Sequence, residues 1–169
     1  MGSFRNYDKK RKSAFSPSQP KEEVIEISSD TVVLEPVYHE SYDLSYTCLL
    51  IPHPNHPLMD DLAEHLPQWL KQICFTFNWQ IEFITVHPEY FQWGLRVIPS
   101  VQTGQFMQEI RQQTSKLIFE AFEQIRSNNP NGDFWAPGYL VVLGTRPHPK
   151  EMIEQYIRLS RRQHKISPT

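Results

Sequence analysis

The stretch FITVHPEYFQWGLRVIP, Phe83–Pro99, decides the fold because its pattern predicts two strands joined by a tight turn. The first strand is Ile81–Val86 and the second is Tyr90–Ile98, both rich in the aromatic and β-branched residues that suit a pleated surface. The turn between them is His87-Pro88-Glu89. A hairpin in the middle of a chain usually lies in the middle of a sheet, so we expect the other elements to pack around it.

The segments before the hairpin predict one strand and one helix. Leu44–Pro52 is an apolar run that ends at a proline, which is typical of a buried strand. Apolar residues recur at spacings of three and four over Asp60–Asn78, which predicts a helix with one buried stripe. Pro67 lies inside this pattern, so either a new helix begins there or the helix kinks.

The segments after the hairpin predict a helix, a strand and a last helix. Ser100 or Thr103 is expected to cap a helix that reaches about Ile125. Trp135–Gly144 predicts a fourth strand, and Pro149–Lys165 predicts the last helix. The first six elements match the ferredoxin-like split β-α-β arrangement, an α+β fold in which an antiparallel four-stranded sheet carries two helices on one face. The predicted C-terminal helix follows these six elements.

Residues 1–43 are predicted to be a disordered tail, and residues 44–166 the folded domain. Pro and Ser interrupt the tail and its apolar residues are few, so burial cannot offset the entropy of ordering it. Its β-prone run contains Val24, Ile25 and Ile27. This run resembles a SUMO-interacting motif, or it is a generic strand that docks on this domain or on a partner. We therefore predict that any protein partner of the tail contacts this run.

The charge of the chain excludes a generally basic nucleic-acid binder, because 17 Lys and Arg stand against 19 Asp and Glu. From Ser45 onward there are eleven basic and eleven acidic residues, and four of the basic ones lie in the last dozen positions. The C-terminal end is thus the basic one. The sequence has no apolar run of transmembrane length, and its N-terminus lacks the apolar region of a signal peptide. We expect a cytoplasmic protein that does not contact a membrane.

The cysteines and histidines do not indicate a disulfide or a metal site. Cys48 and Cys74 lie in apolar surroundings, which favours buried thiols in a cytosolic protein. Four histidines suggest a metal site, but the two in HPNHP lie in an extended, proline-bounded turn with no Cys or carboxylate at ligand spacing beside it. These four residues are His53, His56, His65 and His87.

Four patterns occur in a fixed order between about residues 45 and 163: PEYFQWGLRVIPS, MQEIRQQTSKLIFEAF, FWAPGYLVVLG and EMIEQYI. Together they resemble the tyrosine-dependent HUH transposases of small insertion sequences and their REP-associated domesticated relatives. In that family the first pattern contains Pro-Asp-His-x-His before an apolar strand. The last pattern is a helix with Tyr-Ile-x-x-Gln.

The resemblance implies a chemistry whose metal ligands are missing in this chain. In the family two His and a Gln hold a divalent metal, and the helix Tyr attacks DNA to form a phosphotyrosine link. Tyr156 matches the nucleophile, whereas Tyr90, Gln92 and Ser160 stand at the three metal positions. Phenol, amide and hydroxyl groups make a poor site for Mg²⁺ or Mn²⁺. We therefore expect no metal, no cofactor and no enzyme activity, with Tyr156 packing the last helix onto the sheet.

Two functions follow from the resemblance, and the sequence leaves both open. The first is a catalytically inactive, domesticated transposase-like domain that binds structured or single-stranded nucleic acid. Its predicted phosphate contacts are Arg111, Lys116, Arg158, Arg161 and Arg162, and its predicted stacking residues are Trp93, Tyr90 and Trp135. Against it, the basic residues are explained equally well as solvated helix faces with i,i+4 partners such as Glu154 and Arg158. The second is a protein-interaction subunit or adaptor, and the sequence is also compatible with a homodimer.

Overall fold

The computed structural model describes residues 43–129 and 132–166. The predicted tail with Val24, Ile25 and Ile27 lies outside these residues, apart from Asp43. None of the described helices is both long and apolar enough to cross a bilayer.

The four strands form one antiparallel sheet, as the sequence predicts. They are β1 (Leu44–Leu50), β2 (Gln80–His87), β3 (Tyr90–Val97) and β4 (Leu140–Leu143). Their order is β2-β3-β1-β4, and every neighbouring pair is antiparallel. The second hairpin strand, β3, is therefore central, but the first, β2, is an edge strand, as is β4, so only half of the hairpin lies in the middle of the sheet as expected. This order confirms the predicted split β-α-β arrangement.

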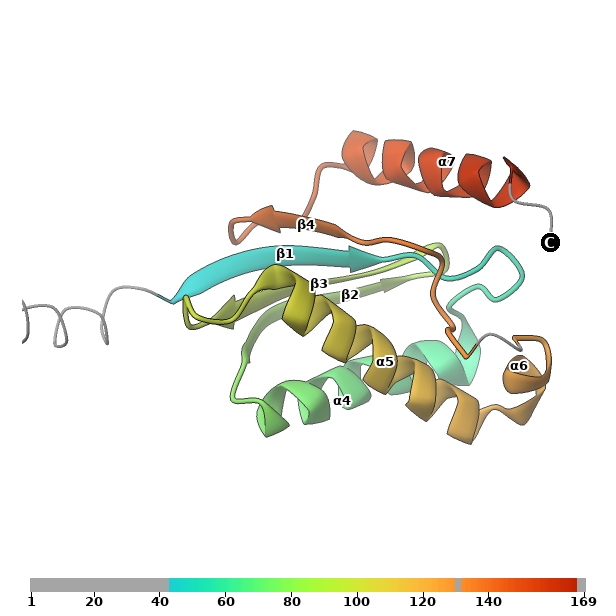
Figure 1. Ribbon diagram of the computed structural model, residues 1–169, viewed down its shortest axis with the longest axis horizontal. Helices are drawn as coiled ribbons and strands as arrows, with labels where there is room; N and C mark the ends of the chain where they lie inside the picture. The colour runs from blue at the N-terminus through green and yellow to red at the C-terminus, as the bar shows by residue number, and fades with distance from the viewer. Residues whose placement is uncertain (1–42, 130–131, 167–169) are drawn as a thin grey trace, which may run out of the picture. The chain divides into compact units, whose positions relative to one another are not determined.

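Helices cover both faces of the sheet (Figure 1). The long helices α4 (Asp60–Thr76) and α5 (Thr103–Ala121) lie on one face, which we call the inner face, and α7 (Lys150–Ile166) lies on the opposite, outer face. A short helix, α6 (Glu123–Ser127), follows α5. The main core lies on the inner face, where β1 and β3 pack against α4 and α5.

The hairpin alternates between the two faces as a strand must. Phe91 and Trp93 are fully buried in the main core, while Tyr90 packs against a second, smaller cluster under α7. A bulge in β2 between Ile81 and Phe83 shifts the register against β3. Beside it, Gly94 leaves room for the Phe83 ring, because a Cβ on Gly94 would lie 2.6 Å from Cε1 of that ring.

The elements differ from the sequence predictions in several details, one of which is that the helix predicted to reach about Ile125 ends at Ala121 and is followed by the separate helix α6. Helix α4 runs unbroken through Pro67, so no new helix begins there. Gln102 stands at the N-cap of α5, and its side chain makes no capping hydrogen bond, so the predicted capping by Ser100 or Thr103 is wrong. The predicted strand Trp135–Gly144 is a strand only over β4, because its first half is tied to α5 instead.

Arg111 of α5 makes that tie. Its Nη2 donates hydrogen bonds to the carbonyl oxygens of Trp135 and Ala136 at 3.0 and 2.7 Å, and its Nη1 donates one to the Gly138 carbonyl at 2.8 Å. Its Nε donates to Asp133 Oδ2 at 2.7 Å. Three carbonyls thus point at one guanidinium group, which holds the backbone away from the sheet.

Two hydroxyl groups of α5 complete the attachment. The Trp135 indole Nε1 donates to Thr114 Oγ1 at 2.9 Å, and the Phe134 backbone N–H donates to Ser115 Oγ at 3.1 Å. Both hydroxyls are buried, as are both aromatic rings. The segment 133–138 therefore satisfies its polar groups mainly through α5, although Trp135 also forms a single bridge with Pro52.

The two cysteines are buried free thiols, which confirms the sequence prediction. Burial raises the pKa of Cys74 to about 12, and burial together with Cys74 raises the pKa of Cys48 further. Both thiols are therefore protonated at neutral pH and act as small apolar groups in the main core.

We predict that Gly94→Ala lowers the free energy of unfolding by about 1–3 kcal/mol, the usual cost of overpacking. The reason is the 2.6 Å approach of the new methyl group to the Phe83 ring. Chemical denaturation measures this cost in the natural background and in a Phe83→Ala background. The cost should fall by at least half when the ring is removed. An equal cost in both backgrounds would contradict the contact.

We predict that Arg111→Ala lowers the free energy of unfolding by about 2–3 kcal/mol, because it leaves three carbonyls without their charged donor. Arg126→Ala on α6 is the matched control, since Arg126 is exposed and its removal should change stability by less than about 0.5 kcal/mol. Urea denaturation of both variants measures these changes in the free energy of unfolding. Equal small effects would show that Arg111 does not hold the segment.

Candidate functional site

The structure brings the positions that the resemblance singles out to the outer face of the sheet. Tyr90 of β3 and Tyr156 of α7 both pack, partly buried, against the cluster of Leu49, Ile51, Ala136 and Ile153. Gln92 of β3 and Ser160 of α7 are buried. The prediction that Tyr156 packs the last helix onto the sheet is thereby confirmed.

Gln92 fixes the chain just before α7. It is 3 % exposed, and its Oε1 accepts a hydrogen bond of 2.8 Å from the backbone N–H of His148. Thr47 on the neighbouring strand β1 donates from Oγ1 to the Arg146 carbonyl at 2.7 Å. Two buried polar side chains of the sheet thus bind the segment 146–148, and this segment sets where α7 begins.

The environment of Tyr156 disfavours its ionised form. Burial raises the pKa of its phenol, and the nearby Arg111 charge only partly offsets that shift. The Tyr156 hydroxyl lies close to Gly138, since a Cβ on that glycine would be 3.0 Å from Oη. The phenolate is the attacking species of a tyrosine nucleophile, and burial opposes its formation at this position.

The residues at the family's metal positions do not fit a divalent ion. The Gln92 carbonyl oxygen already accepts the His148 N–H, and the hydroxyl of Ser160 is a weak ligand. Tyr90 stacks on His87, with ring centroids 4.5 Å apart and planes 10° apart. Across the described part of the chain, no group of three His, Cys, Asp or Glu side chains could hold a metal ion.

A cavity of about 460 Å³ lies on the outer face between α7 and the β2–β3 hairpin. It touches Tyr90 and Gln92 on the hairpin side and Ile153 and Ile157 on the α7 side. Two of the positions that carry the family's metal site therefore border an open space in this protein.

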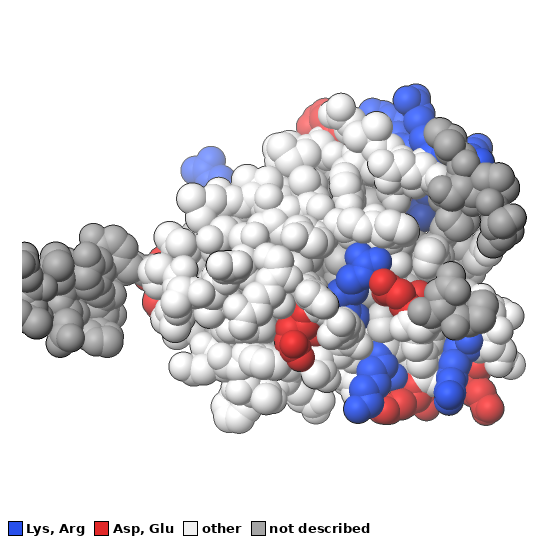
Figure 2. Space-filling model, viewed as in Figure 1, with Lys and Arg blue, Asp and Glu red and all other residues white. Residues whose placement is uncertain are grey.

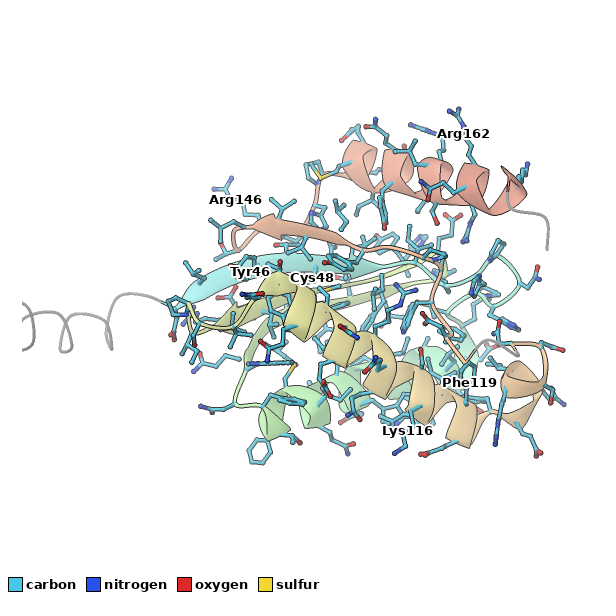
Figure 3. All side chains as sticks on the ribbon, in the orientation of Figure 1. Tyr46, Cys48, Lys116, Phe119, Arg146 and Arg162 are labelled. Atoms are coloured by element: carbon cyan, nitrogen blue, oxygen red, sulfur yellow. The ribbon has the colours of Figure 1, made fainter. Side chains whose placement is uncertain are left out.

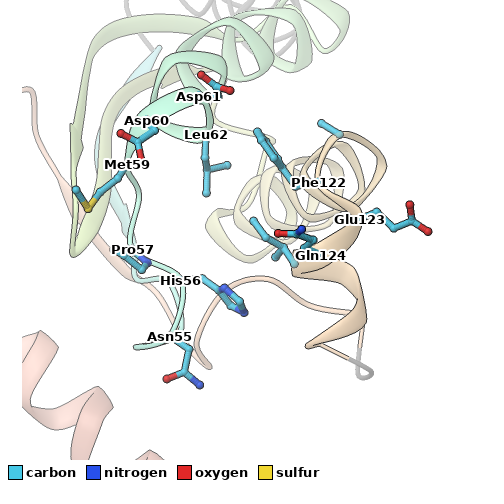
Figure 4. A pocket seen from close by; sticks show the side chains of 12 residues that line it. Asn55, His56, Pro57, Met59, Asp60, Asp61, Leu62, Phe122, Glu123 and Gln124 are labelled. Atoms are coloured by element: carbon cyan, nitrogen blue, oxygen red, sulfur yellow. The ribbon is translucent and has the colours of Figure 1, made fainter.

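A second cavity, of about 570 Å³, lies between the start of α4 and the junction of α5 with α6 (Figure 4). Its charged lining residues are Asp60, Asp61 and Glu123, and it has no Lys or Arg among the described residues. In Figure 4 the Glu123 carboxylate points away from the two aspartates, so the three groups do not converge. An acidic lining disfavours phosphate, which sets this cavity apart from the basic helix α7.

Basic side chains gather on α7, at the upper right of Figure 2, whereas basic and acidic side chains alternate over α5 and α6. Arg158 and Arg162 are exposed and make no ion pair with any described residue. Glu154 pairs with Lys150 at 3.8 Å, so the suggested pairing of Glu154 with Arg158 is not formed.

The other predicted phosphate contacts are placed differently. Arg161 donates from Nη1 to the Pro52 carbonyl at 2.9 Å; burial lowers its pKa, and the nearby Glu89 opposes that shift. Lys116 is exposed on α5, on the opposite side of the sheet from Arg162 (Figure 3). Its Nζ lies 4.0 Å from Oε1 of Glu120. Arg111 is occupied by the carbonyls of segment 133–138. The structure thus brings together only the predicted arginines of α7.

Two of the three predicted stacking residues are out of reach. Trp93 is 0 % exposed and Trp135 is 1 % exposed, both inside the main core. A base cannot stack on either ring in this fold, so these two predictions are wrong. The period of two places Trp93 on the inner face, under α4 and α5. Tyr90 precedes Phe91 on β3 and points to the other face of the sheet. Of the three predicted stacking residues, it alone is partly exposed.

Comparison with known proteins agrees with the architecture. A solved structure of a protein described as a transposase from Deinococcus radiodurans superposes with a TM-score of 0.63 at 24% identity, covering 70% of this chain and 92% of that one. This likeness shows the fold. A REP-associated tyrosine transposase bound to a REP hairpin gives a TM-score of 0.42 at 12% identity, covering 72% of this chain and 68% of that one.

The sequence itself also matches a family. No curated protein matches it significantly. The family model "Transposase IS200 like" matches residues 40–160, well over half of the chain, and this range includes β1 to β4 and most of α7. The chain therefore belongs to the IS200-like transposase family.

Proposed function

We propose that this protein is a catalytically inactive, domesticated member of its family that binds single-stranded or structured nucleic acid along α7. The observation that carries the proposal is the concentration of positive charge on this helix. Helix α7 holds five Lys and Arg and two Glu, whereas the chain from Ser45 to Pro149 holds six Lys and Arg and nine Asp and Glu. The near-neutral net charge of the domain is therefore the sum of a basic helix α7 and an acidic remainder.

The cations of α7 form a stripe. At 3.6 residues per turn, they fall within an arc of about 120° on the helix surface, beside the arc that Ile153 and Ile157 turn toward the sheet. The five residues are Lys150, Arg158, Arg161, Arg162 and Lys165. The same arc also contains Glu151 and Glu154, and Glu154 pairs with Lys150, so the uncompensated positive charge lies in the second half of the helix. Cations along one side of that half suit a row of phosphates, and release of counterions from the strand favours their contact.

Inactivity is supported by the occupied Gln92 carbonyl and by the environment of Tyr156. A tyrosine nucleophile needs a polarised phosphate and a phenol that loses its proton readily. Here the three ligand positions hold no metal-binding set, and burial raises the pKa of Tyr156. Binding without cleavage is the function that remains for such a surface.

A protein-interaction role is a second candidate, and the edge strand β4 favours it. Val142 and Leu143 are 41 % and 65 % exposed, and Tyr139 beside them is also exposed. An apolar strand at a sheet edge is a ready site for an added strand from a partner. This surface is separate from the cation stripe, so the two functions can be tested independently.

We predict that Arg158→Glu with Arg162→Glu weakens binding of a labelled single-stranded or hairpin DNA by tenfold or more, because two attractive interactions with phosphates become repulsive. For a single strand, the slope of log affinity against log salt should fall by roughly 0.7 for each phosphate that the variant no longer neutralises. Fluorescence anisotropy over a salt series measures both quantities.

The matched control reverses the same number of charges on another face, with Lys116→Glu and Arg126→Glu, both exposed. This control should bind nearly as well as the natural protein. If the natural protein binds no DNA at low salt, or if the control loses as much affinity as the α7 variant, α7 is not the binding surface. Capture of a protein that contacts Leu143 would then favour the second candidate.

A further inference from the structure

The outer-face cavity has the size and the walls of a ligand site. Its volume of about 460 Å³ falls in the usual range of small-molecule pockets, about 300–1,000 Å³. One wall is the stacked pair of His87 and Tyr90, and the other is formed by Ile153 and Ile157 of α7. Aromatic and aliphatic walls of this kind suit a flat ring, which gains contact on both of its faces.

Hydrogen-bonding groups without partners border the same cavity. His148 is only 6 % exposed, and its Nε2 has no hydrogen-bond partner among the described residues. Gln92 uses its Oε1 for the His148 backbone, and its amide N–H groups donate to no described residue. A buried polar atom without a partner, such as His148 Nε2, costs free energy, and a ligand with matching donors and acceptors would pair with it and with the Gln92 amide.

The charges around the cavity exclude phosphate from its interior. Glu89 and Glu154 line it against a single lysine, Lys150, which already pairs with Glu154. Carboxylates accept hydrogen bonds from the N–H groups of an uncharged ring and repel a phosphate. The cations that could hold phosphates lie outside, farther along the same side of α7.

We propose that this cavity binds one planar nitrogen heterocycle of the nucleobase class, presented as an unpaired base by the strand that α7 holds. The ring inserts between the His87–Tyr90 pair and the isoleucines of α7, and its polar edge meets Gln92 and His148. The proposal rests on the proposed function for the source of the base. The chemistry of the cavity itself would accept a base from a free nucleoside as well.

Blocking the cavity tests the proposal. Thr85 is exposed on β2 and lines the cavity, so Thr85→Trp should fill it without disturbing the core, and aromatic residues suit strands. Gln80→Trp is the matched control, because Gln80 is exposed at the start of the same strand and does not line the cavity. Thermal unfolding verifies that both variants fold.

The binding probes are a labelled single-stranded DNA of mixed sequence, a strand of equal length made of abasic residues, and the four free ribonucleosides. Thr85→Trp should weaken binding of the mixed strand about tenfold, the order expected for one stacked base, and leave the abasic strand unaffected. Gln80→Trp should bind both strands as the natural protein does.

Each other result has a distinct meaning. If the natural protein binds both strands equally and Thr85→Trp changes neither, the base pocket is wrong and the α7 interface stands. Another result is that no strand binds, that a free nucleoside does, and that Thr85→Trp abolishes nucleoside binding. This result would support the cavity as a nucleoside site and contradict the proposed function. If neither strands nor nucleosides bind, both proposals fail.

Discussion

The hydrogen bond from the His148 backbone to the Gln92 carbonyl is the constraint on which the outer face depends. It joins the central strand β3 to the segment that enters α7, and both of its partners are buried. Thr47 of β1 holds the same segment two residues earlier in the chain. Because buried polar groups must be paired, these two contacts fix the start of α7, and the apolar cluster around Ile153 fixes its body.

The same constraint explains why the family's metal chemistry does not fit here. The side-chain carbonyl of Gln92 already accepts a hydrogen bond from the backbone that leads into α7, so it cannot readily bind a metal ion as well. The buried hydroxyl of Ser160 on α7 is a weak metal ligand. The outer face nevertheless has a cavity next to Tyr90, and α7 has its cations beside that cavity. Under the proposed function, the aromatic cavity would hold a base and the cation stripe of α7 would hold phosphates.

Much of the fold could be predicted from the sequence, because hydrophobic period and turn chemistry act locally. The hairpin and its alternation of faces followed from the aromatic and β-branched residues of Tyr90–Val97, and the split β-α-β arrangement followed from the order of the predicted elements. The length of the fourth strand could not be predicted, because it depends on Arg111, whose partners are carbonyls 24 to 27 residues away. Only a faint signal existed in α5, where Arg, Thr and Ser at positions 111, 114 and 115 share one side of the helix.

The candidate site was predicted in part. The positions of Tyr90, Gln92, Tyr156 and Ser160 were found through the family resemblance, and the structure places them on one face. The burial of Trp93 also follows from the strand period, once the inner face is known. The cavity, the role of His148 and the bond to Gln92 have no local pattern, because a backbone N–H that meets a side chain 56 residues away leaves no mark in the sequence.

The central claim is that the outer face has the family's fold without its metal site. The most direct test is a titration of the full chain with Mn²⁺, followed by ¹H–¹⁵N NMR, because a bound paramagnetic ion broadens the signals of nearby amides. We predict that the amides of Tyr90, Gln92 and Ser160 broaden no more than exposed amides elsewhere in the chain. Selective broadening of these three at low Mn²⁺ concentration would show that a metal site persists and would contradict the account.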